Sequence, residues 1–353
     1  MKQLIIIGGG FAGAYIARKL ESEFAVTLFD TKDYFEFTPS VLRTLVEPKH
    51  LQRIEVPHQA YLHTAMIIRK PVTEVTDNEV IGGGKEYLFD YLVIASGSRY
   101  TVPIKEENIV IAARGRELQQ WAHQLEKAKN VLIVGGGIVG TELAAEIVER
   151  FPEKEITLIH SKKDLLERNP RKAQKYARRF LQRRGVKIIF EERVVDTAAK
   201  KYATNKGREI FADLAFLCTG IAPNSQFLKK NGKITLAEDS FVQVNAHLQV
   251  TNCPNIFAAG DITNIKEEKT AQAAEKQAEV VIDNLRALAE GRKLREYVSK
   301  ARPMVISLGK WNGILVYHHF VWTGILPGLI KQLIEWKTMR KQKSMDFGIY
   351  QKN

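Results

Sequence analysis

Two glycine-rich loops of one design constrain the fold of this chain more than any other feature. The first lies in "IIGGGFAGAY" at residues 6–15, and the second lies in "IVGGGIVGTE" at residues 133–142. Each loop follows an apolar run typical of a buried strand and precedes a helical segment that leads to a second strand. This order of elements is the parallel unit that binds a dinucleotide. The sequence therefore predicts an α/β fold with two Rossmann-like dinucleotide-binding domains.

Both loops have three glycines at the spacing G-x-G-x-x-G. The first glycine permits a tight turn, the second lets backbone approach a pyrophosphate, and the third lets the helix pack closely on the strand. The helix that follows offers free N–H groups and the positive end of its dipole to the phosphates. Asp30 ends the second strand of the first unit, where an acid binds ribose hydroxyls. The glycines are Gly8, Gly10 and Gly13 in the first loop, and Gly135, Gly137 and Gly140 in the second.

The second unit has no acid at the corresponding place. There "ITLIHSKKD" offers His160, followed after one serine by Lys162 and Lys163. An acid at this position favours the free 2′-hydroxyl of NADH, whereas basic groups favour the 2′-phosphate of NADPH. We therefore expect this unit to accept NADPH as well as NADH. If both lysines point into water instead, the two cofactors bind alike, and the sequence leaves this choice open.

The second unit is inserted into the first domain. An apolar strand with a glycine turn, "YLVIASGS" at 91–98, closes the first unit, and "FLCTGIAPN" at 216–224 closes the second. A third strand of the same kind, "NIFAAGDIT" at 255–263, then returns to the first domain. We predict a discontinuous first domain from residues 1–112 and 243–300, a second domain from 113–242, and a separate C-terminal segment from 301–353.

Composition restricts the partners and the compartment. The chain has 353 residues and a formal net charge of +13, which favours an anionic partner such as nucleic acid, an acidic membrane or a phosphorylated substrate. A solvated basic surface is the plain alternative. The two cysteines lack C-x-x-C spacing and suit a reducing compartment, and "MKQLIII" at the start does not resemble a secretory signal. We expect a cytosolic protein or one held on the cytosolic face of a membrane.

Five ordered motifs resemble those of the two-dinucleotide-domain flavoproteins with a glutathione-reductase-like fold. They are "IIIGGGFAG", "YLVIASGS", "VLIVGGGIVGTELAAEI", "FLCTGIAPN" and "NIFAAGDI". Within this family, "FPEKEITLIHS", "CTGI" and "EWKTMR" are similar to the ferroptosis suppressor and apoptosis-inducing-factor-like group. "YFEFTPSVLR" at 34–43 is similar to the segment beside the flavin in type II NADH dehydrogenases. The resemblance implies FAD in the first domain and NADH or NADPH in the second.

The resemblance also implies which residues bind the cofactors. Asp261 is expected on the ribityl and pyrophosphate part of FAD, and Glu142 is expected near the nicotinamide ribose. Hydride transfer then needs both rings to stack between the domains. For FAD the implied contacts are Gly8, Gly10, Phe11, Ala12, Gly13, Asp30, Lys32, Pro39, Arg43, Val72, Ala95, Ser96, Gly97, Gly260 and Asp261. For NAD(P)H they are Gly135, Gly137, Ile138, Val139, Gly140, Glu142, His160, Thr219 and Gly220.

The electron acceptor is harder to predict. A disulfide substrate needs a redox-active cysteine pair, whereas Cys218 lies in a predicted buried strand and Cys253 lies in a turn, so inert thiols are expected. "TAQAAEKQAE" at 270–279 is similar to the quinone-pocket helix of type II NADH dehydrogenases. Gln272 matches that pattern, but Lys276 stands where the second glutamine is expected. We predict that Glu142, Gln272 and Lys276 are catalytic; the alternative is an Ala-rich helix whose polar residues face water.

The C-terminal segment predicts a helix on a membrane surface. From Trp311 to Ile330 only His318 and His319 can carry a charge, and Gly and Pro interrupt the stretch, so a spanning helix is not expected. The two histidines have no third ligand nearby, and no metal is predicted. On a helical wheel, one face is apolar and a basic end follows, which suits an anionic interface; packing on the core or on a dimer partner is the alternative. That face contains Leu326, Leu329, Ile330, Leu333, Ile334 and Trp336, while Lys331, Gln332, Glu335 and Thr338 lie off it.

These observations together predict an FAD-dependent NAD(P)H:quinone oxidoreductase that lies on a membrane and does not pump protons. One alternative is a soluble flavin reductase for a small redox protein. Another is a nucleic-acid-binding or signalling protein, although the basic residues are not interleaved with aromatics and no nucleic acid is expected. A homodimer is compatible with the sequence.

Overall fold

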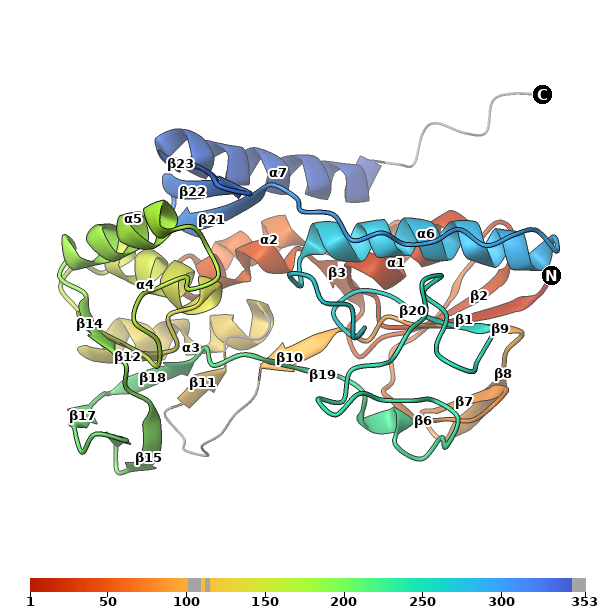
Figure 1. Ribbon diagram of the computed structural model, residues 1–353, viewed down its shortest axis with the longest axis horizontal. Helices are drawn as coiled ribbons and strands as arrows, with labels where there is room; N and C mark the ends of the chain where they lie inside the picture. The colour runs from red at the N-terminus through yellow and green to blue at the C-terminus, as the bar shows by residue number, and fades with distance from the viewer. Residues whose placement is uncertain (101–108, 112–114, 345–353) are drawn as a thin grey trace.

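The computed structural model describes residues 1–100, 109–111 and 115–344, and contains two five-stranded parallel sheets of the same plan (Figure 1). Both sheets place the strand before the glycine loop at the centre, because its two faces are covered and its residues are apolar. The first sheet has the order β20 (Ile256–Ala258), β9 (Tyr91–Ile94), β1 (Gln3–Ile7), β2 (Ala25–Phe29) and β5 (Met66–Ile68). The second has the order β11 (Ile109–Ile111), β18 (Leu214–Leu217), β12 (Asn130–Val134), β13 (Glu155–His160) and β14 (Lys187–Phe190). The predicted pair of Rossmann-like domains is confirmed.

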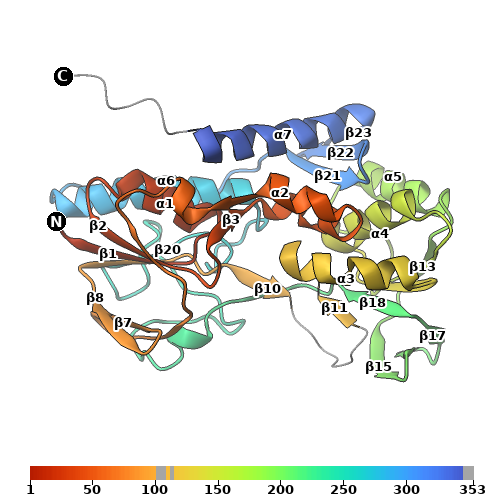
Figure 2. The same ribbon diagram turned by 180° about the vertical axis from the view of Figure 1, so that it is seen from behind.

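Helices cover one face of each sheet, and antiparallel strands lie on the other side (Figures 1 and 2). Helices α1 (Phe11–Leu20) and α6 (Ala271–Ala289) pack together over the first sheet. The second domain has α3 (Gly115–Lys127), α4 (Ile138–Arg150) and α5 (Arg171–Gln182). The antiparallel sheets are β6 (Val72–Val75), β7 (Glu79–Gly82) and β8 (Lys85–Leu88) in the first domain, and β15 (Val194–Ala198), β16 (Lys201–Thr204) and β17 (Glu209–Phe211) in the second.

Strand pairing corrects the predicted boundary between the domains. Strand β11 falls inside the predicted first domain, yet it pairs in parallel with β18 of the second sheet. The change of domain therefore precedes Ile109 instead of following residue 112. Two short strands, β10 (Ser98–Tyr100) and β19 (Ile221–Pro223), pair antiparallel between the two sheets.

Several short elements between β2 and β5 connect the first sheet with the second domain. The segment contains β3 (Tyr34–Glu36), η1 (Thr38–Leu45), η2 (Pro48–His50), α2 (Leu51–Ile54), β4 (Glu55–Pro57) and η3 (His58–Ala60). Element η1 packs against both α3 and α4. The 3-10 helix η4 (Gln226–Leu228) lies after β19 and completes the list of elements outside the C-terminal segment.

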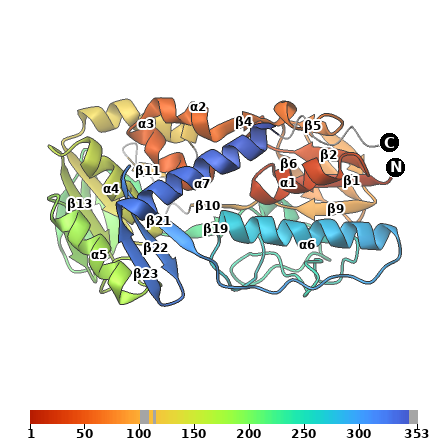
Figure 3. The same ribbon diagram turned by 90° about the horizontal axis from the view of Figure 1, so that it is seen from above.

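The C-terminal segment is a three-stranded antiparallel sheet followed by a helix. Strands β21 (Met304–Leu308), β22 (Asn312–Tyr317) and β23 (Phe320–Gly324) precede α7 (Ile325–Ser344). Seen from above, α7 runs from the sheet beside the second domain to the first domain (Figure 3). Among the described residues, no helix has both the length and the hydrophobicity needed to cross a membrane.

The orientation of α7 differs from what an amphipathic helix normally does. The predicted apolar face points outward: Leu326, Leu329, Leu333 and Trp336 are exposed, with 41–59% of each side chain accessible. Lys331, Gln332, Glu335 and Thr338 are less exposed and lie toward the body of the protein. The polar side of α7 packs on the body of the protein, because the buried charged residues of η1 and α4 lie beneath it. The apolar face that the sequence predicts for a membrane surface is therefore exposed, and the polar side packs on the protein.

Candidate functional site

Each glycine loop requires glycine at its first and third positions. Gly8 and Gly135 have φ angles of +102° and +113°, a region that disfavours any residue with a side chain. A Cβ atom on either would lie 2.3 Å from a carbonyl oxygen, that of Ala95 in the first domain and that of Cys218 in the second. A Cβ atom on Gly13 would lie 1.8 Å from the carbonyl oxygen of Gly8. The loops are therefore folded against the neighbouring strand and helix as their spacing predicts.

The second glycine of each loop faces open space. A Cβ atom on Gly10 or on Gly137 would meet no protein atom within 4 Å. Both residues are the N-caps of their helices, α1 and α4, and neither helix has a side-chain cap or an acid in its first turn. The first backbone N–H groups thus remain available to an anion. This arrangement fits a pyrophosphate at each loop, which is the group that FAD and NAD(P)H share.

A buried hydrogen-bond chain fixes the acid at the end of β2. The Asp30 carboxylate accepts a hydrogen bond from the Gly9 N–H at 2.9 Å and lies 3.2 Å from His58 Nε2. His58 is fully buried, and its Nδ1 is 2.5 Å from the Tyr61 hydroxyl. Burial opposes ionisation of Asp30, but the His58 bond and the charge of Lys32 outweigh it and hold the pKa of Asp30 below its usual value. Asp30 therefore keeps a negative charge beside the first loop.

His160 takes the place of Asp30 in the second unit and makes the equivalent contact. Its Nδ1 accepts a hydrogen bond from the Gly136 N–H at 3.0 Å, so the ring is neutral and carries its proton on Nε2. Nε2 lies 3.2 Å from the Glu167 carboxylate. Burial lowers the pKa of His160 in spite of that carboxylate. Lys162 and Lys163 follow and are exposed.

The strand ends beside the first loop are joined by a second set of hydrogen bonds. The Ser98 hydroxyl donates to the Asp261 carboxylate at 2.9 Å, and burial raises the pKa of Asp261. The Gly260 N–H donates at 2.7 Å to the side chain of Gln277, which is fully buried. Gln277 therefore holds the "AAGD" turn in place. The turn glycines Gly97 and Gly260 both have positive φ angles, +65° and +85°.

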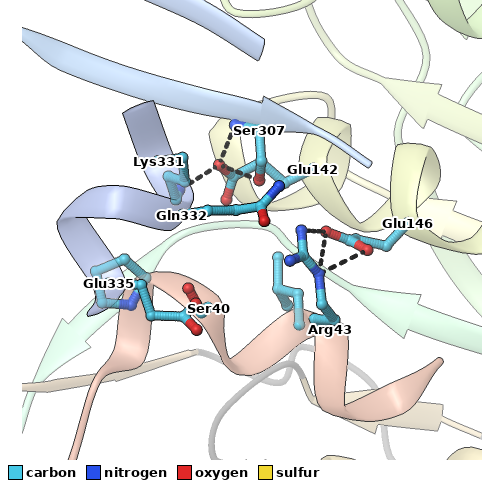
Figure 4. Close-up of a pocket in the computed structure, with 10 residues that line it drawn as sticks. Ser40, Arg43, Glu142, Glu146, Ser307, Lys331, Gln332 and Glu335 are labelled. Carbon is cyan, nitrogen blue, oxygen red and sulfur yellow. Dashed lines mark hydrogen bonds and ion pairs between the residues drawn. The ribbon is translucent and has the colours of Figure 1, made fainter. Parts of the chain in front are cut away.

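A pocket lies where the two domains and the C-terminal segment meet (Figure 4). It brings together Pro39, Arg43 and Glu142, which the sequence analysis assigned to the cofactor sites. Glu142 lies about one hundred residues after the other two in the sequence. Element η1, helix α4, strand β21 and helix α7 each provide part of the wall. The lining residues are Pro39, Ser40, Leu42, Arg43, Glu142, Glu146, Ser307, Lys331, Gln332 and Glu335.

One carboxylate oxygen of Glu142 accepts three hydrogen bonds in this pocket. Its Oε1 accepts from the Ser307 N–H at 2.7 Å, from the Ser307 hydroxyl at 2.9 Å and from Lys331 Nζ at 2.9 Å. Only 7% of the Glu142 side chain and 12% of the Lys331 side chain are exposed. A buried, fully paired charge of this kind holds its geometry, because breaking the pair would leave the other charge uncompensated. Lys331 also ties α7 to β21 through a bond to the Val305 carbonyl.

A second buried ion pair lies one helical turn away on α4. Arg43 Nη2 is 2.9 Å from Glu146, and the side chains are 11% and 7% exposed. Burial disfavours the charge on Arg43, but Glu146 more than compensates and raises the pKa of Arg43. On the opposite wall, Glu335 lies 3.3 Å from His50. Burial of Glu335 is outweighed by His50 and Ser40, which hold its pKa below the usual value.

Sequence reasoning missed several residues of this pocket. Glu146, Ser307 and Lys331 were not predicted, and neither was His58 behind Asp30. The available signal for Lys331 was that it is the first charged residue after the long uncharged stretch, on the polar side of α7. The hydroxyl and backbone of Ser307 carry no comparable signal, since a serine in a strand is common.

Two predicted catalytic residues lie elsewhere. Lys276 is exposed and forms an ion pair with Glu279 of the same helix at 2.7 Å. Gln272 is also exposed and donates to the Pro303 carbonyl. Lys276 and Gln272 both face outward, because Gln277, the residue after Lys276, occupies the buried side of α6. The alternative, an Ala-rich helix whose polar residues face water, describes these two positions. The cation that pairs with Glu142 is Lys331.

The remaining predicted residues lie in or beside the two glycine-loop sites. Val72 begins β6 and packs, half-buried, on a core cluster that includes Phe29. Thr219 and Gly220 are exposed after β18. Lys32 donates its N–H to Asp30 at 3.0 Å. The other positions, within the loops, the strand ends and the first turns of α1 and α4, are Phe11, Ala12, Ile138, Val139, Gly140, Ala95 and Ser96.

The two cysteines are free and buried. Burial raises the pKa of Cys218 to about 12, and it also raises that of Cys253. Thiols of this kind are poor nucleophiles at neutral pH. In the described part of the chain, no group of three metal-binding side chains is present.

A model of the pyridine nucleotide-disulphide oxidoreductase family matches residues 2–278. The chain belongs to this family. Apoptosis-inducing factor homolog B of Dictyostelium discoideum is 32% identical over 345 residues, which cover 89% of each chain. Ferroptosis suppressor protein 1 of Homo sapiens is 29% identical over 358 residues, which cover 96% of each chain.

Two solved structures share the fold over nearly the whole chain. The sulfide:quinone oxidoreductase of Aquifex aeolicus has a TM-score of 0.85 at 19% identity, and the match covers 97% of this chain and 92% of that one. NDH2 of Plasmodium falciparum, solved in complex with NADH, has a TM-score of 0.85 at 14% identity and 97% coverage of both chains. Because each match covers 97% of this chain, the matched region includes most of the C-terminal segment, which lies beyond the end of the family model at residue 278.

Proposed function

We propose that this oxidoreductase, which uses FAD and NAD(P)H, reduces a membrane quinone. The observation that carries the proposal is the buried Glu142–Lys331 pair at the junction of the two domains and α7. Element η1 of the first domain, helix α4 of the second domain and the C-terminal segment meet there. A substrate that reaches the junction from outside meets a fixed carboxylate and a fixed ammonium group.

The glycine loop and the acidic residues of the first domain would hold FAD. Gly10 and the free N–H groups of α1 face the pyrophosphate, Asp30 faces a ribose, and Asp261 lies beside the "ASG" turn. Gly137 and the start of α4 would do the same for NAD(P)H. When bound, FAD supplies the redox chemistry, because its ring exchanges two electrons with the nicotinamide and then with the acceptor.

The protein's own groups would orient and stabilise the reactants. Lys331 is held by Glu142 and by the Val305 carbonyl, so its ammonium group stays in one place. A fixed cation in a site of low dielectric stabilises negative charge that develops on a reacting oxygen. Ser307 keeps the Glu142 carboxylate oriented through two hydrogen bonds. We assign Lys331 to the acceptor and Glu142 to the nicotinamide ribose and to the orientation of Lys331.

A quinone suits this site better than a disulfide or sulfide. Both cysteines are buried, and the pKa of Cys218 is raised to about 12, which removes the nucleophile that sulfur chemistry needs. The A. aeolicus neighbour is named for quinone as well as for sulfide, so the shared fold is compatible with a quinone acceptor.

The C-terminal segment would carry the enzyme to a lipid-soluble acceptor. Nine large apolar side chains on this segment are 40–60% exposed, and we call them the apolar outer surface. Large exposed apolar patches rimmed by polar residues mark protein or membrane contacts. The surface consists of Trp311, Tyr317, Phe320, Trp322, Ile325, Leu326, Leu329, Leu333 and Trp336. We assign it to the cytosolic surface of a membrane, from which a quinone reaches the junction beneath α7.

Steady-state NADH and NADPH oxidation by purified, FAD-loaded protein tests the proposal, with ubiquinone and menaquinone analogues as acceptors. We expect quinone-dependent turnover, and Lys331→Met should lower kcat/KM for the quinone by at least about tenfold. Lys229→Met, which changes an exposed lysine after η4 that does not line the pocket, is the matched control and should change it less than twofold. Both variants should retain FAD, measured from the flavin absorbance. Equal activity of Lys331→Met and Lys229→Met, or turnover with ferricyanide but with no quinone, would contradict the proposal.

A further inference from the structure

Helix α5 is strongly basic, and the proposed redox reaction makes no use of its charge. Residues 171–184 contain seven Lys or Arg residues and no Asp or Glu. Two of the seven are neutralised: Arg178 pairs with Asp164 at 2.8 Å, and Arg184 lies 4.0 Å from Glu149. Five remain exposed, and none of them lies within ion-pair distance of an acid in the described part of the chain. We call these five the basic stripe: Arg171, Lys172, Lys175, Arg179 and Arg183.

The stripe is a consequence of how α5 packs. The opposite side of the helix buries Ala173, Ala177, Phe180 and Leu181 against the second domain. The spacing of four residues between Arg171, Lys175, Arg179 and Arg183 places those charges in one row along the outer side. Like charges in such a row repel one another, which disfavours the helix unless a partner or salt compensates. An uncompensated row on a folded surface therefore favours an anionic partner.

The stripe adjoins the apolar outer surface. The Tyr176 hydroxyl of α5 is 3.4 Å from the Asn312 side chain at the start of β22. Lys172 and Arg179 lie four residues before and three residues after Tyr176, and so flank this contact on the helix surface. Helix α5 also packs beside β23. Seen from above, α5, the β22–β23 hairpin and α7 lie side by side on one face of the molecule (Figure 3).

The apolar part of this face extends beyond α7. In the hairpin, Tyr317 pairs with Phe320, and Leu315 pairs with Trp322. These side chains share one face of the sheet, since partners across a register point to the same side. At the far end of α7, Lys337 and Arg340 are exposed, and the Arg340 guanidinium stacks on the Trp336 ring at 5.2 Å. Basic groups thus border the apolar outer surface at both ends.

We infer that the basic stripe of α5 binds anionic lipid headgroups while the apolar outer surface enters the membrane interface. The inference rests on the proposed membrane docking and adds to it a preference for acidic lipids. Apolar side chains provide attraction to any bilayer, whereas Lys and Arg near the surface add about fivefold each in partitioning to a negatively charged one. An acidic protein or a nucleic acid would use the charge but would leave the adjoining aromatic and aliphatic side chains in water.

Vesicle co-sedimentation of the full-length, FAD-loaded protein tests the inference. The vesicles are phosphatidylcholine alone or phosphatidylcholine with 30% phosphatidylglycerol, roughly the charge density of an acidic leaflet. The test variant is Lys172→Gln, Arg179→Gln, Arg183→Gln. Its matched control, Lys85→Gln, Lys206→Gln, Lys229→Gln, removes the same charge from exposed lysines on β8, in the β16–β17 turn and after η4, all away from this face (Figure 1).

The wild type should bind the acidic vesicles at least tenfold more tightly than the neutral ones, and added salt should reduce the difference. The stripe variant should lose at least tenfold on acidic vesicles and keep its binding to neutral ones, whereas the control should bind as the wild type does. Flavin absorbance and thermal unfolding check that each variant is folded. Equal binding of the wild type to both vesicles, or a stripe variant equal to its control, would overturn the inference.

Two further measurements separate this inference from the proposed function. Leu329→Ser, Leu333→Ser, Trp336→Ser removes apolar contacts and should weaken binding to both kinds of vesicle. Turnover with a water-soluble quinone should be the same for the stripe variant and the wild type. Failure of quinone turnover with intact lipid selectivity would refute the proposed reaction and leave the inference standing. Retention of the wild type by DNA at physiological salt, with no preference for acidic vesicles, would replace the lipid by a nucleic acid and overturn the inference.

Discussion

The first and second glycines of each loop have different structural roles. Backbone geometry requires glycine at positions 8 and 135, whereas a Cβ atom on Gly10 or Gly137 would meet no protein atom. A substitution at the first kind of position acts on folding, and one at the second kind acts on what binds. The same distinction applies to Asp30 and His160, which make equivalent hydrogen bonds to their loops but differ in charge.

This difference between the glycines leads to a prediction for Gly8 and Gly10. Gly10→Ala should fold with a free energy of unfolding within about 0.5 kcal/mol of the wild-type apoprotein, because its φ of −80° is ordinary and its Cβ meets nothing. It should nevertheless lose most of its FAD, since the Cβ fills the approach to the pyrophosphate. Gly8→Ala should be destabilised by more than about 3 kcal/mol, because of its positive φ and the clash with Ala95.

Denaturant unfolding of the apoproteins and the flavin-to-protein absorbance ratio measure the two effects separately. Gly232→Ala serves as the control, because that glycine also has open space and lies far from either loop in the sequence. A Gly10→Ala variant with full FAD content would show that the open space at the start of α1 is not the phosphate site.

At the scale of elements, sequence reasoning succeeded where a spacing has one structural solution. The G-x-G-x-x-G loops and the apolar strands that end in glycine turns, β9, β18 and β20, each imply a definite backbone, and the structure has them. The β21–β23 sheet was not predicted, because β23 has bulky apolar residues on both faces and lacks clean alternation. For α7 the hydrophobic pattern gave the composition of each face but not the side that docks. That side is determined by Arg43, Glu142 and His50, which come from distant parts of the chain.

The end of β13 gives a prediction about cofactor choice. His160 is engaged by Gly136 and Glu167, so discrimination at the 2′-position falls to the exposed Lys162 and Lys163. Lys162→Ala, Lys163→Ala should raise KM for NADPH about five- to tenfold and leave KM for NADH within twofold, since each lysine contributes a partly screened attraction to the 2′-phosphate. Steady-state kinetics with each nucleotide at fixed quinone measures both values. Equal KM changes for the two nucleotides would indicate that the lysines point into water.

At the scale of the molecule, α7 is held by charges that lie underneath it. Lys331 pairs with Glu142, and Glu335 approaches His50, while the outward side of the helix is apolar. This arrangement is costly for a protein that stays in water, because buried charges must be desolvated and apolar residues remain exposed. It is consistent with a segment whose polar side completes the site and whose apolar side meets a membrane. Neither requirement can be read from one amphipathic pattern, which is why the site residues of α7 were missed.

The charges beneath α7 predict a pH dependence of stability. Burial raises the pKa of Glu335, but the hydrogen bonds from His50 and Ser40 outweigh it and hold the pKa below its usual 4.5, with Arg43 nearby as a positive charge. A lowered pKa in the folded state means that Glu335 stabilises the fold fully above about pH 4.5 and that this stabilisation is lost as the pH falls through the folded pKa. Glu335→Gln should therefore lower Tm at pH 7, by about 2–4 °C for each kcal/mol lost, and the difference from wild type should shrink as the pH falls below about 4.5. Thermal unfolding of both proteins from about pH 7 down to about pH 2.5 measures it, with Glu153→Gln, an exposed acid in the second domain, as the control. A Tm difference that is constant over this range would mean that α7 is held by packing and by the Glu142–Lys331 pair, without a contribution from the charge of Glu335.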